Sequence, residues 1–343
     1  MSIIQITKKG TTFSGTKEDL KKLQIEFDKK HCVKLPKLLA SSLLKLIQKR
    51  INDVDFKDKS YKHLGIDSKE LRLKDDATVG ILEFLANDQK LYELIEQITG
   101  CPKIGCFAGR IYRMSPNLGI YDAWHDDDVY NRIVAMSINL STEVYSGGVL
   151  QILDFNSRKI INEVTNTNFG DAILIKISPN LQHRVTEVIG KASRTAFAGF
   201  FHSSPLYKPI FKPYKDAYSK NISNKLTRIS KDSIVQVQPE LFSHKSNGQL
   251  LVFNSRNTSC YGLNVLSEKI LNTLTKPIKV RKLCNSISSE YDIDTGKCEN
   301  DLIKLLSELK TNDLITVNKK TYLKNNNILK KASWKPTKCG CKE

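Results

Sequence analysis

The sequence lacks a long apolar segment and a cysteine framework. No apolar run reaches the roughly 20 residues that a membrane-spanning helix needs, and residues 1–3 do not begin a pattern typical of a signal peptide. The eight cysteines have no regular disulfide-scaffold spacing, so we expect reduced thiols. These absences predict a cytoplasmic protein that has no membrane partner.

The chain is long enough for two domains. It has 343 residues, of which 40% are hydrophobic and 26% are charged, as is typical of a globular protein. Its formal net charge is +18. That charge suits an acidic partner such as nucleic acid or an acidic peptide. A lysine-rich composition with solvated side chains explains most of it more simply.

Metal-ligand residue types gather in the middle of the chain. His125 and Asp127 stand two positions apart, and in an extended chain such residues point the same way. His183 follows the apolar, strand-like run at 170–177 and a Ser-Pro-Asn break. Two histidines and one carboxylate are the facial triad that binds non-haem Fe(II) and leaves coordination positions open. These three residues are therefore the candidate metal ligands and catalytic residues.

Arg194 lies eleven residues after His183, at the start of a strand-like segment. Alternate residues from Arg194 onward would share one strand face. A guanidinium on that face can bind a carboxylate through two hydrogen bonds. Each signal alone is weak, because short motifs occur by chance and a lone His or Arg is commonly an ordinary residue. Their agreement in order, spacing and strand context favours a functional site.

The pattern H-x-D…H-x-V…R is matched by His125, Asp127, His183, Val185 and Arg194. It resembles that of the 2-oxoglutarate- and Fe(II)-dependent oxygenases, particularly the prolyl-hydroxylase-like branch. The resemblance implies an α+β fold with a double-stranded β-helix (jelly-roll) core and Fe(II) held by the two histidines and the aspartate. It also implies that Arg194 binds the distal carboxylate of 2-oxoglutarate, with O2 as cosubstrate and ascorbate as a reductant.

A glycine pair and a tyrosine also have counterparts in this family. The pair Gly147-Gly148 looks like the family's turn into a core strand. Relatives often place a pocket-lining Tyr some eight to ten residues before the first ligand. Here the candidate is Tyr112, thirteen residues before His125. This offset departs from the family pattern, and Ser115 or Asn117 stands nearer the expected place.

Neighbouring polar and aromatic residues are assigned simpler roles. Trp124 can stack against a substrate or pack in the fold, and the sequence favours neither. Asp126 and Asp128 are expected to face solvent or cap a turn. His31 and His202 have no partner pattern and are expected to be structural.

Residues 1–100 are predicted to form a helical support. Thr16 begins a capping-box-like helix start, and Pro36 is expected to open a second helix with apolar residues at helical spacing up to residue 51. Residues 61–74 look polar and irregular, and two more helices are predicted. No residue here suggests a catalytic role. The predicted helices lie near 77–85 and 91–98.

Residues 101–204 are the predicted catalytic core, with strands near 107–114, 133–140 and 148–155. Residues 205–232 contain seven Lys/Arg, two Asp and three Pro, together with aromatic residues. This composition predicts a basic aromatic linker packed on the core. Binding of single-stranded nucleic acid by the same residue types is the alternative.

Residues 233–323 are predicted to form a small winged-helix-like domain. Strands are expected at 235–237, 249–254 and 259–263, followed by three helices and a wing strand near 314–317. The third helix carries a regular leucine stripe between residues 302 and 309. Beyond this domain, 324–343 form a basic tail with Cys339 and Cys341. Two thiolates are too few for a closed zinc site, so a frayed tail is predicted.

Short motifs of this domain match V-x-V-x-P from Val235, Y-x-L-N from Tyr261, Y-D-I-D from Tyr291 and a leucine-rich end at 301–315. They resemble the PqqD-like peptide-binding domain, also called the RiPP recognition element. The resemblance implies that residues 233–323 bind the leader of a ribosomally made precursor peptide as an added β-strand, beside the third strand and third helix. Main-chain hydrogen bonds would then supply the affinity.

The two resemblances together predict a 2-oxoglutarate-dependent hydroxylase of a precursor peptide. A nucleic-acid demethylase or hydroxylase with the same iron site is the alternative, and the net charge favours it. Against it, the third helix at 298–310 balances Lys304 and Lys310 with three acidic residues, whereas a recognition helix should be more basic. A non-enzymatic peptide-binding scaffold is a third hypothesis, and the intact ligand set argues against it.

Overall fold

The structure is a computed structural model of the chain. Most of the predicted linker and the whole tail with Cys339 and Cys341 lie outside the described part. Among the described residues, no helix combines the length and apolar character needed to cross a bilayer. The described ranges are 2–63, 66–116, 122–129, 131–165, 167–204, 229–246, 249–263, 265–291 and 295–318.

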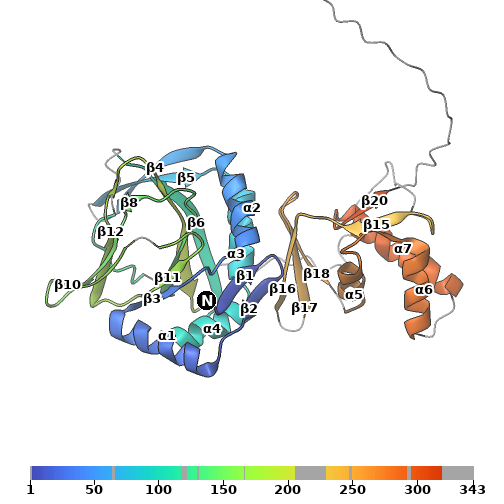
Figure 1. The fold of residues 1–343 in the computed structure, drawn as a ribbon, viewed down its shortest axis with the longest axis horizontal. Helices are drawn as coiled ribbons and strands as arrows, with labels where there is room; N and C mark the ends of the chain where they lie inside the picture. Colours follow the sequence, from blue (N-terminus) through green and yellow to red (C-terminus); the bar gives the residue numbers. More distant parts are fainter. Residues whose placement is uncertain are drawn as a thin grey trace, which may run out of the picture.

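A seven-stranded antiparallel sheet, here the major sheet, forms one wall of the catalytic core (Figure 1). Its order is β3-β11-β7-β14-β6-β5-β4. The predicted run at 170–177 is confirmed as a strand that is buried on both faces, which explains its unbroken apolar sequence. The strands are β3 (Cys32–Leu35), β4 (Phe56–His63), β5 (Ile66–Leu73), β6 (Cys106–Met114), β7 (Arg132–Asn139), β11 (Ala172–Lys176) and β14 (Arg194–His202).

A smaller sheet of order β10-β9-β12 and a two-stranded pair of β8 and β13 form the opposite wall. Apolar side chains of both walls pack into one interior cluster, for example Ala135 of the major sheet with Ile152 and Val185 of the smaller one. A sheet-rich core of this kind is consistent with the predicted jelly roll. The strands are β8 (Ser146–Gly147), β9 (Leu150–Asp154), β10 (Lys159–Val164), β12 (Leu181–Val185) and β13 (Val188–Ile189).

Four helices cover the outer face of the major sheet (Figure 1). Phe107, Phe197 and Phe201 of the sheet are fully buried beneath them. The predicted capping box is present, because Thr16 and Asp19 each bond the other's backbone N–H. The helices are α1 (Lys17–Lys30), α2 (Ser41–Asn52), α3 (Asp76–Ala86) and α4 (Gln89–Thr99).

Two predictions for this region are wrong. Pro36 does not open a helix: Lys37 has a left-handed φ of 49°, and α2 begins only after Ala40. Residues 61–74 are not irregular, because most of them form β4 and β5 at the edge of the major sheet. Charged side chains are common on edge strands, where they discourage pairing with other chains, and here they hid the strand pattern.

A further hairpin, β1 (Ile4–Thr7) with β2 (Gly10–Phe13), lies beside the C-terminal segment (Figure 1). That segment contains two three-stranded sheets and three helices with their own apolar cluster. The first sheet has the order β19-β15-β20 and the second β16-β17-β18. The strands are β15 (Ile234–Val237), β16 (Leu241–Ser246), β17 (Gln249–Asn254), β18 (Ser259–Leu263), β19 (Ile278–Lys279) and β20 (Ile315–Asn318). The helices are α5 (Val265–Thr273), α6 (Val280–Tyr291) and α7 (Thr295–Thr311).

This segment contains a strand that was not predicted. The predicted first strand, β15, pairs with β19 and β20. The partner of β17 in the other sheet is β16, for which no strand was expected. Its polar residues Ser243, His244 and Lys245 interrupt the apolar alternation that marks a strand.

Candidate active site

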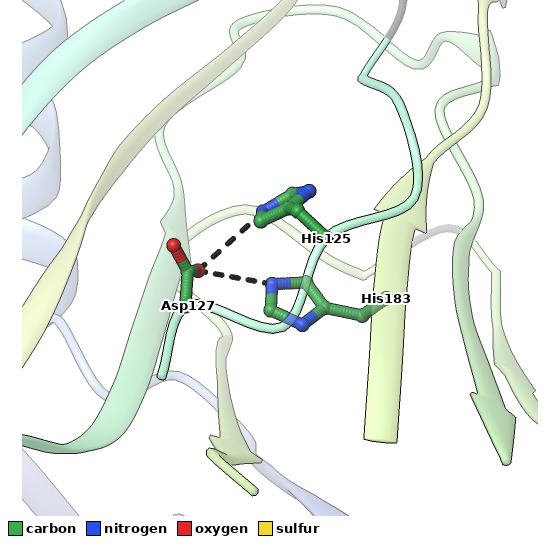
Figure 2. A group of neighbouring side chains, drawn as sticks. All are labelled: His125, Asp127 and His183. Carbon is green, nitrogen blue, oxygen red and sulfur yellow. Dashed lines mark ion pairs between the residues drawn. The ribbon is translucent and has the colours of Figure 1, made fainter. Parts of the chain in front are cut away.

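The three predicted ligands meet inside the barrel (Figure 2). One atom from each of His125, Asp127 and His183 lies within 4.8 Å of the other two. Oδ2 of Asp127 is 3.4 Å from Nε2 of His125 and 3.2 Å from Nε2 of His183. Two imidazole nitrogens and one carboxylate oxygen thus converge on one point.

The backbone brings these residues together in a way that the extended-chain argument did not predict. Asp127 has a left-handed φ of 59°, so the segment after His125 turns instead of continuing as a strand. His125 and His183 exchange two backbone hydrogen bonds, of 3.1 and 2.8 Å, in an isolated antiparallel bridge. The bridge fixes the first histidine beside β12, and the turn directs the carboxylate toward both imidazoles.

Hydrogen bonds and nearby charges set the ionisation of the cluster. Burial disfavours a charged His125, but its bond to Asp127 and the charge of Asp122 outweigh burial and raise the pKa of His125 to about 9. Burial likewise raises the pKa of Asp127, but bonds from His125 and His183 hold that pKa well below its usual range. The carboxylate is therefore ionised and attracts positive charge to this point, which a metal cation supplies as well as a proton does.

Two residues hold these ligands in place. Nδ1 of His125 lies 2.7 Å from the carbonyl oxygen of Ala123 and 3.6 Å from Oδ1 of Asp122, which leaves Nε2 directed at the cluster. Arg132 donates from Nη1 to Oδ1 of Asp127 at 3.0 Å. Its guanidinium also lies 3.9 Å from the ring centroid of Phe200. Such supporting contacts fix ligand orientation around metal sites.

A second cluster surrounds Arg194 on the inner face of the major sheet. Its Nη1 lies 2.7 Å from the hydroxyl of Tyr112, to which it donates, and its Nη2 donates to Oγ of Ser137 at 3.3 Å. Burial would lower the pKa of Arg194, but Tyr112 and Tyr145 raise it above its usual value. The buried guanidinium therefore stays charged. The sequence-predicted Tyr112 and Arg194 are thus neighbours despite the unusual offset of Tyr112.

The other residues of the motif have ordinary contacts. Oδ1 of Asp126 accepts a hydrogen bond from the backbone N–H of Asp128 at 3.0 Å, which confirms a turn-capping role. Trp124 packs beneath the guanidinium of Arg184 at 4.5 Å, which favours the packing interpretation. His202 is buried, with Nδ1 3.0 Å from Oδ1 of Asn131, in agreement with a structural role.

Four residues of the two clusters were not predicted from the sequence: Asp122, Arg132, Ser137 and Tyr145. Arg132 and Ser137 left a faint signal, because each is a polar residue beside or inside the apolar run at 133–140. Asp122 and Tyr145 left none. The role of Tyr145 depends on Arg194, which lies far away in the sequence, whereas Asp122 is only three residues before His125 and has no motif of its own.

Family comparison identifies the core. The 2OG-Fe(II) oxygenase superfamily profile matches residues 110–202, which contain both clusters. The chain carries a 2OG-Fe(II) oxygenase domain. A second profile, coenzyme PQQ synthesis protein D (PqqD), matches residues 249–315. That range runs from β17 to the first residue of β20.

Several solved structures are similar to this chain. A 2OG-Fe(II) oxygenase family oxidoreductase from Burkholderia pseudomallei shares 16% identity over 56% of this chain and 94% of its own, with a TM-score of 0.43. A Trichoplax adhaerens prolyl hydroxylase in complex with a hypoxia inducible factor peptide shares 15% over 55% and 94%, with a TM-score of 0.39. A Pseudomonas putida prolyl-4-hydroxylase shares 13% over 54% and 100%, with a TM-score of 0.37. No curated protein matches the sequence.

The residues of the oxygenase domain fit the groups that the superfamily name states. Two imidazole nitrogens and a carboxylate oxygen suit Fe(II), which would take the place of the proton on His125, and three ligands leave positions open for other groups. A buried, permanently charged guanidinium flanked by hydroxyls suits a carboxylate such as either end of 2-oxoglutarate. The barrel therefore contains one cluster whose residue types suit a cation and a second whose residue types suit a carboxylate.

Proposed function

We propose that this protein hydroxylates a residue of a ribosomally made precursor peptide. His125, Asp127 and His183 would hold Fe(II), and Arg194 with Tyr112 would hold the distal carboxylate of 2-oxoglutarate. The observation that carries this proposal is the pairing of an oxygenase domain at 110–202 with a PqqD domain at 249–315 in one chain. A peptide-binding domain fused to an oxidising domain fits a peptide substrate.

When bound, the iron supplies the oxidation of an unactivated C–H bond. Overall, one C–H bond of the substrate and one O2 yield a hydroxyl group, while 2-oxoglutarate loses CO2 and becomes succinate. The residues of this chain would orient the metal ligands and exclude water. Arg132 and Asp122 would keep Asp127 and His125 aimed at the metal, and the apolar barrel interior would keep water from the reacting atoms.

The leader would bind as an added strand on the free edge of β18. In the sheet β16-β17-β18, the edges belong to β16 and β18. The β16 edge is occupied, because the backbone N–H of Ser243 donates to the carbonyl of Lys8 at 2.9 Å. No strand pairs with the outer edge of β18 among the described residues. An open edge of this kind suits recognition by main-chain hydrogen bonds.

The test uses the full chain and fluorescently labelled synthetic peptides from short open reading frames beside the gene. One peptide should bind and, with Fe(II) and 2-oxoglutarate, gain 16 Da per hydroxylation. Versions N-methylated at single positions then test strand addition. In a β-ladder only alternate N–H groups of an edge strand point to a given neighbour. Binding should therefore fall with methylation at every second position and persist at those between.

Two results would contradict the proposal. No peptide binding together with salt-dependent binding of random oligonucleotides would favour the nucleic-acid alternative. Peptide binding without succinate formation by the iron-loaded protein would favour a peptide-binding scaffold. If N-methylation at every position is tolerated equally, the leader does not bind as an added strand, and the rest of the proposal is unaffected.

A further inference from the structure

Strand β17, in the middle of the sheet β16-β17-β18, is buried on both of its faces, by two different parts of the molecule. Leu250 and Val252 of β17 belong to the apolar cluster of the PqqD segment. Phe253, the next residue, belongs instead to the cluster of the oxygenase domain, as does its cross-strand partner Phe242. Two-sided burial explains why residues 250–253 are uniformly apolar and do not alternate.

Rings from both parts pack together at this contact. Phe84 of α3 stacks on Phe253 with ring centroids 5.5 Å apart and planes 25° apart. The same phenylalanine lies 4.5 Å from the ring of His244 in β16. Phe242 is 1% exposed and Phe253 is 7% exposed, so the contact excludes water. We name this contact, formed by Phe84, Phe242, His244 and Phe253, the docking face.

Two glycines allow the close approach. A Cβ atom on Gly10 would lie 3.0 Å from Cβ of His244, and Gly10 has a φ of 96° that other residues rarely adopt. A Cβ atom on Gly80, inside α3, would lie 3.3 Å from Cζ of Phe253. Both distances are short for carbon atoms. The backbone of the oxygenase domain is thus shaped to receive β16 and β17.

A hydrophobic contact of this kind limits the relative movement that the linker at 205–232 would otherwise permit. Proline and lysine content at 205–232 suits a linker that permits independent movement. Domains of one chain move relative to one another by default, unless their interface is large and hydrophobic. At the docking face the two parts share one water-excluding core, which opposes such movement.

We propose that the docking face holds the leader-binding edge at a fixed separation from the iron site, so that peptide length selects the residue that is oxidised. This inference rests on the proposed function. When the leader is bound, the peptide segment that follows it must span the fixed distance from the leader-binding edge to the iron site. Effective concentration at the active site is near zero for a segment too short to span, is maximal at a matching length, and then falls roughly as the −3/2 power of length.

The spacing dependence is therefore asymmetric. Shortening the peptide between leader and oxidised residue below the matching length abolishes hydroxylation there. Doubling that length lowers turnover only about threefold. Deletions should also shift oxidation to residues farther along the peptide, because those residues then reach the iron.

Cleavage of the linker tests the docking face without a peptide. A protease recognition sequence is placed within 205–228 of the full chain, and the cut protein is passed over a size-exclusion column. The two parts should elute together. Gly80→Leu should separate them, because leucine is a good helix former but adds bulk against Phe253. Phe84→Ala should weaken the contact by truncation. Ile25→Ala is the matched control, since Ile25 is 58% exposed in α1.

The outcomes separate the docking inference from the proposed function. Separation of the cut wild-type parts, or retention by Gly80→Leu equal to wild type, would overturn the docking face. The spacer series uses the precursor peptide found by the binding panel. Bound peptide with turnover independent of spacing would overturn the fixed separation alone. If no peptide binds, the proposed function fails, and the column still decides whether the two parts dock.

Discussion

Arg132 donates a hydrogen bond to the one oxygen of Asp127 that does not face the two histidines. Nη1 of Arg132 lies 3.0 Å from Oδ1, whereas Oδ2 faces both imidazoles at 3.2 and 3.4 Å. Because the guanidinium also rests on Phe200, its position is fixed independently of the carboxylate. The aspartate is thereby directed to offer a single oxygen to the cluster.

Arg132→Gln should lower metal affinity. Loss of an outer contact to a metal ligand typically costs about 10–100-fold in affinity. Titration calorimetry with Co(II), which replaces air-sensitive Fe(II), measures the change. Arg158→Gln is the control, because Arg158 lies over Phe155 outside both clusters. Equal affinities for the two variants would remove the positioning role of Arg132.

Asp127→Asn should abolish stabilisation by metal. A cation at 100 times its dissociation constant stabilises the folded state by about 2.7 kcal/mol, or roughly 5–10 °C in Tm for a domain of this size class. Thermal unfolding with Co(II) and with EDTA should show this difference for the wild type. Asp126→Asn should retain it, since Asp126 caps a turn and faces away from the cluster. A shift that survives in Asp127→Asn would exclude that residue as a ligand.

Tyr112→Phe should weaken 2-oxoglutarate binding while leaving metal affinity unchanged. The hydroxyl lies 2.7 Å from Nη1 of Arg194 and orients it. Removing one partner of a hydrogen bond to a charged group costs about 1.5–3 kcal/mol, or roughly 10–150-fold in affinity. Succinate formation at varied 2-oxoglutarate gives the KM. Arg194→Lys keeps the charge but loses the forked geometry, and an unaltered KM in that variant would contradict the assignment.

The docking face should weaken in acid. Burial lowers the pKa of His244, while Asp88 and the backbone carbonyl of Lys245 oppose the shift. Nearby on the same sheet, the ammonium of Lys8 lies over Phe242 and that of Lys245 pairs with Glu268. A lowered pKa means that the contact is fully stable above the ordinary value of about 6.5. Below that value, the equilibrium constant for docking of the two parts falls by up to about tenfold per pH unit.

The linker-cut protein measures this pH dependence directly. Its two parts should elute together at pH 7.5 and begin to separate near pH 5.5. His244→Phe keeps a ring against Phe84 but cannot take up a proton, so its elution should not change over this range. Separation of that variant at low pH would assign the effect to other groups.

Gly199→Ala should destabilise the barrel strongly. Gly199 of β14 stands opposite Gly109 of β6, and an added Cβ would lie 2.1 Å from the carbonyl oxygen of Ala108. Overpacking costs about 1–3 kcal/mol, and a rigid backbone atom places this change near the upper end. Urea unfolding measures the loss. Gly100→Ala is a poor comparison because of its positive φ, so Ala198→Gly, on the same strand, serves as the control for altered strand propensity.

Much of the site followed from the sequence because its signals are local. His125, Asp127, His183 and Arg194 sit beside strand-like runs or turns whose order alone predicts that they can converge. The capping box at Thr16 is equally local, and it is present. Patterns confined to a few neighbouring residues do not depend on the rest of the fold.

Predictions failed where a distant segment decides the structure. Strand β16 lacks an apolar alternation because one of its buried positions is His244, which packs against Phe84 of the distant helix α3. Strand β4 lies at the edge of the major sheet and β5 lies next to it, and their sequences are rich in polar residues that give no local strand signal. Asp127 leaves the extended conformation, at a φ of 59°, because Arg132 and the two histidines hold its carboxylate.

The sequence by itself determined the chemistry of this protein: which side chains can bind a cation, which can bind a carboxylate, and where the regularly patterned helices and strands lie. These depend on residue type and short spacing, which the chain carries in linear order. The tertiary structure alone decided that Arg132 and Tyr145 join those side chains, and that β16 and β17 share a core with α3. Such relationships arise from packing between segments far apart in the chain, where shape and exclusion of water select the neighbours.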